Sequence, residues 1–181
     1  MDKSLASHPS GAEKLRRAYH ITPDLSDPVA LRNILQFATD IQFYAPAISF
    51  AEGWPGKSYL YHFNELNHWE GTWKGESTHI LDVAFLFQNF SEFLEPAQKE
   101  VGVRFAKDFI KFINGKCELA DFGDGKEGAQ VYGPSRDGIT SEHVEGIGSE
   151  RTGRKITISE LGDEFGLDEL SAVWDNFMMG N

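Results

Sequence analysis

Hydrophobic residues recur at helical spacing over one long stretch near the start of the chain. The stripe follows Ser26-Asp27-Pro28, a typical helix start, in which Ser26 or Asp27 can cap the free amides. Pro46 predicts a kink or break near Tyr44, because proline lacks the amide hydrogen that an inner helical turn needs. The stripe consists of Leu31, Ile34, Leu35, Ala38, Ile41, Ala45 and Ile48.

The pattern changes in residues 57–90. The uncharged aromatic run YLYHF, residues 59–63, has the length and β-propensity of a buried strand. A loop rich in tryptophan and glycine then leads to His79, and Asp82 and an apolar run over 83–87 follow. A strand followed by a loop that presents a histidine is a common way to place a catalytic base at the carboxyl edge of a sheet.

Helical periodicity returns after Glu95-Pro96 and ends at Asn114-Gly115. Residues 116–153 are rich in glycine and charge and predict a loop, with one short strand near 130–132. A last helix is expected over 167–178, and a short basic helical piece around 14–19. The expected buried face of the second long helix is Val101, Phe105, Phe109, Phe112 and Ile113.

These elements include too few strands for a complete sheet. One convincing strand would leave its backbone groups unpaired on both sides, which a buried strand does not tolerate. Parallel strands also need neighbours and helices on both faces. The pattern therefore predicts an α/β protein whose sheet is incomplete, either because a partner supplies the other strands or because this chain is the C-terminal part of a larger protein.

Charge narrows the classes of partner. The chain has 17 basic and 28 acidic residues, a net charge of −11, which argues against nucleic acid and anionic membranes. The only cysteine, Cys117, excludes an internal disulfide and a cysteine-based zinc site. No stretch has the apolar length of a membrane span, and residues 1–11 lack the apolar core of a secretory signal, so we expect a cytoplasmic protein.

His79 is the leading candidate for chemistry, as a general base or as a loop histidine satisfied by its neighbours. Asp82 is either the hydrogen-bond partner of His79 or a cap for the following helix. Ser77 lies in GESTH, which misses the G-x-S-x-G nucleophile motif because His79 replaces the second glycine, and no strand precedes it. We therefore expect Ser77 to be a solvated loop residue.

Three further patterns suggest a function, but each also has a purely structural interpretation. His62, Glu65, His68 and His79 form a metal-like cluster, but the H-E-x-x-H spacing is missing, and no metal or cofactor is expected. Glycines 123, 125 and 128 match G-x-G-x-x-G, yet the acidic residues inside the motif would repel a pyrophosphate. The large aromatic residues Trp54, Trp69 and Trp73 line an acyl pocket or anchor the core and loops.

The order of these features resembles a known family. The kinked helix reads FATDIQFYAPA, the strand YLYHFN and the loop WKGESTH, with FLF starting six residues after His79. Together they resemble the C-terminal portion of type-B carboxylesterases, the α/β-hydrolase branch that includes cholinesterases and related lipases, and fungal members most of all. The similarity is best over residues 24–115, with a polar lead-in over 1–23 and a variable tail over 116–181.

The resemblance implies that His79 is the base of a Ser–Glu/Asp–His triad and that Asp82 stands behind it as a supporting acid. It implies an ester substrate, hydrolysed through an acyl-serine. Ile80 departs from the family, where glycine often follows the histidine. The nucleophile serine, the oxyanion loop and the triad acid would lie upstream, so we expect the chain alone to be inactive.

The expected partners are accordingly an N-terminal hydrolase segment or a second copy of the chain. A parent enzyme of this family is also compatible with secretion. The alternative hypothesis is a non-catalytic, mainly helical interaction protein.

Overall fold

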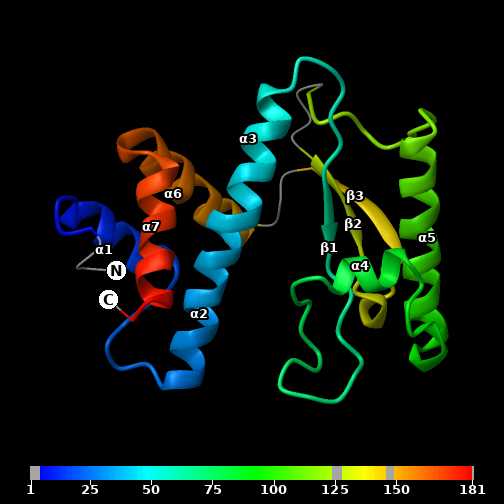
Figure 1. Cartoon of the computed structure of the whole chain (residues 1–181), viewed down its shortest axis with the longest axis horizontal. Helices are drawn as coiled ribbons and strands as arrows, with labels where there is room; N and C mark the ends of the chain where they lie inside the picture. The colour runs from blue at the N-terminus through cyan, green and yellow to red at the C-terminus, as the bar shows by residue number, and fades with distance from the viewer. Residues whose placement is uncertain (1–4, 124–127, 146–148, 181) are drawn as a thin grey trace. The chain divides into compact units, whose positions relative to one another are not determined.

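The computed structural model describes residues 5–123, 128–145 and 149–180 of the 181-residue chain (Figure 1). The chain divides into two compact units. The helical unit contains Met1–Gly53 and Gly148–Asn181, and the sheet unit contains Trp54–Ile147. The described residues combine helices with a small three-stranded sheet, which agrees with the mixed α and β composition expected from the sequence.

The helical unit is built from two segments that are far apart in sequence. The first supplies α1 (Pro9–Ala18), α2 (Asp27–Thr39) and α3 (Ala45–Gly53), and the second supplies α6 (Ser149–Phe165) and α7 (Leu167–Met178). Their buried faces meet in one hydrophobic core, as expected for helices with an apolar stripe. The core residues are Leu5, Ala12, Leu15, Tyr19, Phe37, Ile41, Ala45, Ile158, Leu161, Leu170 and Val173.

The expected break in the long helix is present. A π-helical turn, Asp40–Tyr44, separates α2 from α3, and Pro46 is the second residue of α3. Proline cannot donate to the carbonyl four residues earlier, and a wider turn relieves that mismatch. At this turn the buried carboxylate of Asp40 accepts hydrogen bonds from Tyr19 Oη and Arg154 Nε, each at 3.0 Å, which ties α6 to the break.

The sheet unit contains β1 (Tyr61–Phe63), β2 (Gly128–Tyr132) and β3 (Ser141–Glu145), in the order β1-β2-β3. β1 pairs with β2 in parallel, with Tyr61 opposite Gln130, and β2 pairs with β3 antiparallel. Between β1 and β2 the chain forms α4 (Leu81–Leu86), the 3₁₀ turn Ser91–Phe93 and α5 (Pro96–Ile113). A second 3₁₀ turn, Ser135–Asp137, lies between β2 and β3.

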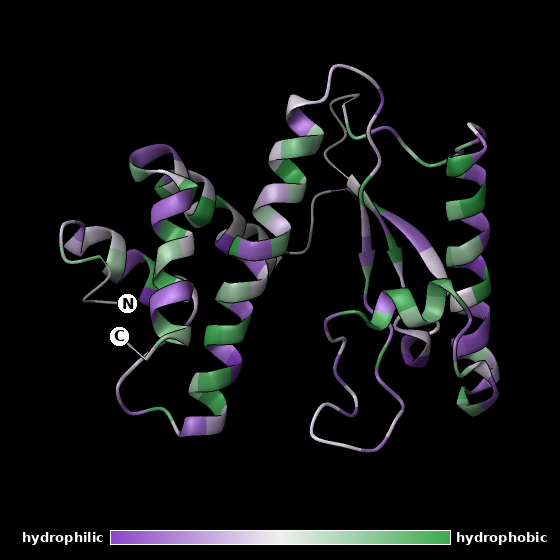
Figure 2. Ribbon diagram, in the orientation of Figure 1, coloured by the Kyte–Doolittle hydropathy of each residue, from purple (hydrophilic) through white to green (hydrophobic). Residues whose placement is uncertain are grey.

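One face of this sheet packs against α5 (Figure 1). Side chains alternate along a strand, so Tyr61 and Phe63 of β1 share a face with Tyr132 of β2. The ring of Phe105 on α5 lies 5.0 Å from Tyr61, 5.5 Å from Phe63 and 4.8 Å from Tyr132, measured between centroids. Figure 2 shows α4 mostly hydrophobic and α5 with both hydrophobic and hydrophilic residues along its length.

The expected buried face of α5 is wrong beyond Phe105. Val101 and Phe105 are buried, but Phe112 and Ile113 are exposed and Phe109 lies at the margin. The helix has 18 residues and spans about 27 Å, whereas the five residues of β2 span about 17 Å, so the last turns extend past the sheet. The buried position after Phe105 belongs to Asp108, whose carboxylate accepts hydrogen bonds from Arg104 and Tyr132.

The expected loop over 116–153 is also wrong in part. The short strand expected near 130–132 is confirmed within β2, but β3 and the start of α6 lie in the same stretch. The last helix, α7, has the expected bounds, and no helix among the described residues combines the length and apolar character needed to cross a membrane. The glycine motif at 123–128 falls largely outside the described residues, because 124–127 are not described.

Candidate functional site

His79 lies on the connection between β1 and α4, two residues before the helix begins. The side chain is exposed. Hydrogen bonds hold the base of this loop: Asn67 N donates to Glu76 O at 3.0 Å and Gly75 N donates to Asn67 O at 2.8 Å. Ser77 Oγ donates to Phe63 O at 2.8 Å, at the carboxyl end of β1. The loop therefore returns Ser77 to the carboxyl end of a strand that has a parallel neighbour, and His79 follows two residues later.

Asp82 is held by Tyr61. The Tyr61 hydroxyl donates to Asp82 Oδ2 at 2.9 Å, which links the first turn of α4 to β1. Partial burial raises the pKa of the Tyr61 hydroxyl, and the charge of Asp82 raises it further, so Tyr61 stays a neutral donor. The helix-cap interpretation of Asp82 is wrong, because the N-cap residue of α4 is Ile80. Sequence reasoning missed Tyr61, because periodicity does not show that its hydroxyl reaches a residue 21 positions away in the chain.

Ile80 has a left-handed backbone, with φ 68° and ψ −1°. An L-residue in this region is strained, and a β-branched residue more than most. The side chain is exposed, so buried contacts do not explain the choice of isoleucine. Glycine is the residue that adopts this conformation without strain.

Ser77 does not form a nucleophile elbow. Its side chain is exposed, and its hydroxyl proton is directed at the backbone carbonyl of Phe63. The residues before it form the turn around Gly71–Glu76 and not a strand. A serine that donates to a carbonyl oxygen is not activated as a nucleophile. The expectation that Ser77 is a loop residue agrees with these contacts.

The metal-like cluster does not come together as a metal site. Among the described residues, no three or more histidine, cysteine, aspartate or glutamate side chains are grouped to hold an ion. The buried carboxylate of Glu65 is instead occupied by hydrogen-bond donors from Ser135 and Gln98. A carboxylate saturated in this way has a structural role in the sheet unit.

The three tryptophans have different environments. Trp69 packs against the small core of Leu81, Phe85 and Leu94, with its ring 6.5 Å from that of Phe85. Trp54 and Trp73 are exposed. Trp69 is therefore an anchor of the loop that carries His79, in agreement with the second of the two interpretations offered for these residues.

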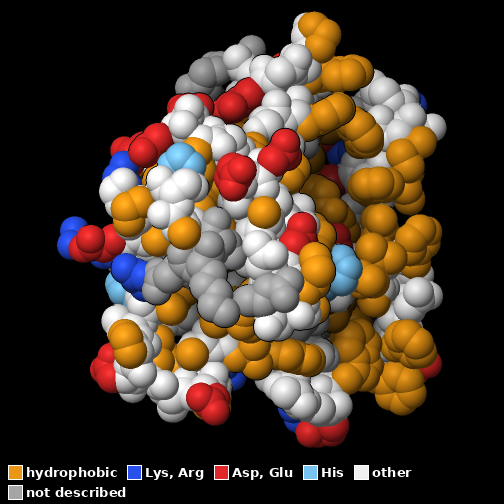
Figure 3. Space-filling model, turned by 60° about the vertical axis from the view of Figure 1, so that its left-hand side comes forward, with side chains coloured by type: hydrophobic (Ala, Val, Ile, Leu, Met, Phe, Trp, Pro, Cys, Tyr) orange, Lys and Arg blue, Asp and Glu red, His pale blue; other side chains and the backbone are white. Residues whose placement is uncertain are grey.

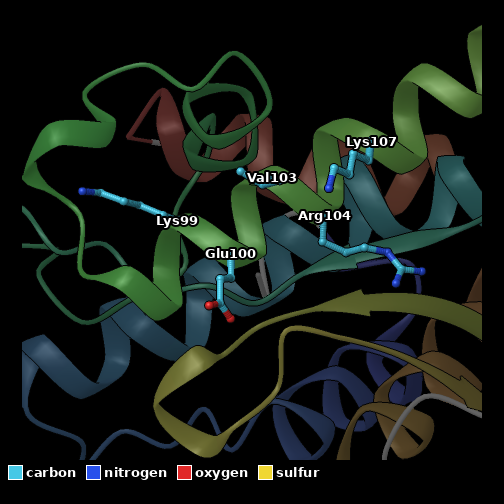
Figure 4. A pocket seen from close by; sticks show the side chains of 5 residues that line it. All are labelled: Lys99, Glu100, Val103, Arg104 and Lys107. Carbon is cyan, nitrogen blue, oxygen red and sulfur yellow. The ribbon is translucent and has the colours of Figure 1, made fainter.

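A surface pocket of about 310 Å³ lies on α5, lined by Lys99, Glu100, Val103, Arg104 and Lys107 (Figure 4). Figure 4 shows Lys99 and Arg104 extending in opposite directions. Arg104 is bound to Asp108 through Nε at 2.6 Å. The basic side chains therefore do not converge on a common ligand. All five lining residues belong to α5, so the pocket does not include the loop that carries His79.

No protein-family model, curated protein or solved structure matches this chain.

Proposed function

We propose that this chain is the histidine-bearing, C-terminal part of a carboxylic ester hydrolase of the type-B carboxylesterase kind. The observation that supports the proposal is the hydrogen bond from Ser77 to Phe63 O, which ties the loop that carries His79 to the end of β1. His79 follows β1 on a loop tied to the end of that strand, beside a parallel neighbour. The carboxyl edge of parallel strands is where α/β enzymes place catalytic groups. The motifs around His79 support the choice of family.

In this proposal His79 takes the proton of a serine nucleophile and returns it to the leaving alcohol. Asp82 supports the site from behind, oriented by the Tyr61 hydroxyl at 2.9 Å. The triad acid itself comes from elsewhere in the enzyme. The substrate class is a carboxylic ester, and no cofactor or metal takes part.

The nucleophile must come from another segment. The 181 residues contain no G-x-S-x-G motif, and Ser77 is bound to a carbonyl. β1 is a terminal strand of the described sheet, and Leu60 O and Asn64 N form its bonds to β2. By alternation, the backbone groups of Tyr59 and Tyr61 face the other edge. We propose that a serine-bearing hydrolase segment adds its strands at this edge.

The experiment compares the chain alone with the chain co-expressed with an N-terminal type-B carboxylesterase segment that carries G-x-S-x-G. We expect no hydrolysis of p-nitrophenyl butyrate by the chain alone above an equimolar imidazole control, and turnover by the complex. His79→Ala should lower that turnover by about 10⁴-fold, because the serine then stays protonated. His143→Ala, which removes another exposed histidine, is the matched control and should retain activity.

Asp82→Asn should cost much less than His79→Ala if the triad acid lies elsewhere. Turnover by the chain alone that is lost in Ser77→Ala would overturn the proposal. Near-normal turnover of the complex with His79→Ala would remove the role of His79.

Exposed aromatic side chains support a second candidate function, that of an interaction protein. Large aromatic residues of the sheet unit, Phe87, Phe90 and Phe93, are exposed next to α4 and α5. Such residues are also typical of a non-catalytic interaction protein. Size-exclusion chromatography separates the two: a stable monomer that never assembles with a serine-bearing hydrolase segment favours the interaction protein.

A further inference from the structure

Among the described residues of the sheet unit, Glu65 is the most deeply buried charged side chain, with 1% of its surface exposed. It lies two residues beyond the end of β1. Its carboxylate accepts four hydrogen bonds: from Ser135 N at 2.7 Å, Ser135 Oγ at 3.1 Å, Gln98 Nε2 at 3.2 Å and its own neighbour Leu66 N at 3.1 Å. Three of these donors approach Oε1 and the Ser135 amide approaches Oε2, so both oxygens of the carboxylate are engaged.

These contacts join three separate elements. Ser135 begins the 3₁₀ turn after β2, and Gln98 is the third residue of α5. Gln98 also donates to Leu66 O at 3.1 Å and accepts from Glu95 N at 3.4 Å in the capping box of α5. A single carboxylate therefore connects the end of β1, the N-terminus of α5 and the turn after β2.

The turn after β2 packs directly against Glu65. Gly133 has φ 77°, and a Cβ atom there would lie 2.8 Å from the backbone and the carboxylate of Glu65. Only glycine permits both this conformation and this approach. The contact fixes the turn at a position where Ser135 can donate twice.

We propose that Glu65 is a positioning residue for the loop that carries His79. The loop base begins two residues after Glu65, where Asn67 pairs with Glu76 and Gly75. Glu65 fixes the point at which the chain leaves the sheet, and Ser77 brings it back to Phe63 O. His79 follows two residues later. The consequence for catalysis rests on the function proposed for His79, but the placement of the loop does not.

Glu65→Gln is the decisive change. The variant keeps the volume, but its NH₂ group must face one of the donors in either orientation, so at least one donor loses its acceptor. Glu92→Gln is the matched control, because it makes the same chemical change at an exposed glutamate of the same unit. Ser135→Ala is a milder second variant that removes the hydroxyl bond and keeps the backbone bond.

Native-state hydrogen exchange on the full chain measures the effect. In Glu65→Gln we expect the protection of the Asn67 and Gly75 amides to fall by about tenfold or more, and to fall further than that of the Phe105 amide in α5. Ser135→Ala should give a smaller loss at the same two amides, and Glu92→Gln none. An equal loss at all three amides, or no loss at Asn67 and Gly75, would overturn the proposal.

A second readout follows the histidine itself. With ¹³Cε1-labelled histidine, the His79 ring signal, assigned by its loss in His79→Ala, should broaden or split in Glu65→Gln and stay single in Glu92→Gln. An unchanged signal would contradict the positioning role. In the assembled esterase, Glu65→Gln should lower kcat more than it changes KM. If Glu65→Gln loses amide protection in the loop but the assembled esterase keeps full turnover, the positioning role of Glu65 is upheld and the proposed role of His79 is refuted.

Discussion

At the scale of single residues, Ile80 is the clearest conflict between local preference and structure. Its φ of 68° lies where β-branched residues are rarely found, and its side chain is 56% exposed. We expect Ile80→Gly to raise the free energy of unfolding of the sheet unit by roughly 1 kcal/mol, because the strain removed exceeds the entropy that glycine adds to the unfolded chain.

Urea unfolding followed by tryptophan fluorescence tests this prediction in a Trp174→Phe background, where the remaining tryptophans, 54, 69 and 73, all lie in the sheet unit. Ile110→Gly is the control. Its side chain is exposed to a similar extent, but it lies inside α5, so glycine should cost about 1 kcal/mol there. A loss of stability in Ile80→Gly would show that the side chain makes contacts that outweigh the strain.

Tyr132 makes the sheet unit sensitive to alkali. Burial raises the pKa of its hydroxyl, and the charge of Asp108, which accepts its hydrogen bond at 3.0 Å, raises it further. Below about pH 10 the folded and unfolded states both hold the proton, and the full stability is present. As pH rises further, the unfolded chain releases the proton first. Stability should then fall by up to about 1.4 kcal/mol per pH unit.

The measurement is urea unfolding of the Trp174→Phe protein between pH 8 and 11.5. Tyr132→Phe should be less stable at pH 8, because Asp108 loses a donor, but its stability should decline less steeply above pH 10. Tyr59→Phe keeps Tyr132 and should retain the original slope. Identical slopes in all three proteins would contradict the role of Tyr132.

At the same scale, sequence reasoning finds residues but not their partners. The spacing around His79 predicts a loop at the end of a strand, and the structure has that loop. The partners of Asp82 and Glu65 are 21 and 70 residues away, at Tyr61 and Ser135. Periodicity has no information on such contacts, which form only when segments distant in the chain pack together.

At the scale of elements, composition explains why β3 is not predicted from the sequence. β3 reads SEHVE, with four polar residues out of five, because it is an edge strand with much of its surface exposed. α6 was missed because it contains Gly153 and Gly162 and the β-branched run ITI. The helix is nevertheless stabilised by packing, since Ile158 and Leu161 are buried in the helical unit.

The last turns of α5 extend past the sheet, so its aromatic residues should contribute unequally to stability. Phe105→Ala should cost about 3–5 kcal/mol, because this ring is buried against three aromatic side chains of β1 and β2. Phe112→Ala should cost about 1 kcal/mol or less, since Phe112 is exposed and contacts only the rings of Tyr59, edge-on, and Phe109, at a tilt, among the aromatic pairs of the described residues. Urea unfolding of the two variants compares these costs directly. Equal costs would show that the last turns of α5 are packed in solution as tightly as the turn that carries Phe105.

At the scale of the whole molecule, a strong negative charge coexists with exposed hydrophobic side chains. Figure 3 shows hydrophobic side chains gathered along one margin of the view, with few charges among them. The net charge of −11 opposes association, and the apolar surface favours it. The balance between the two depends on salt, because the screening length falls from about 10 Å at 0.1 M to about 3 Å at 1 M.

We therefore expect self-association of the chain to increase with salt. Sedimentation velocity at pH 7.5 should show larger species at 1 M NaCl than at 0.05 M, since screening weakens the repulsion and leaves the apolar attraction in place. Ile113→Lys should reduce them, because this side chain is 67% exposed on the last turn of α5, where a cation also suits the helix dipole. Lys116→Ile, at an exposed position three residues further on, should have the opposite effect. A monodisperse monomer at every salt concentration would contradict this prediction and would show that the exposed apolar side chains do not drive association.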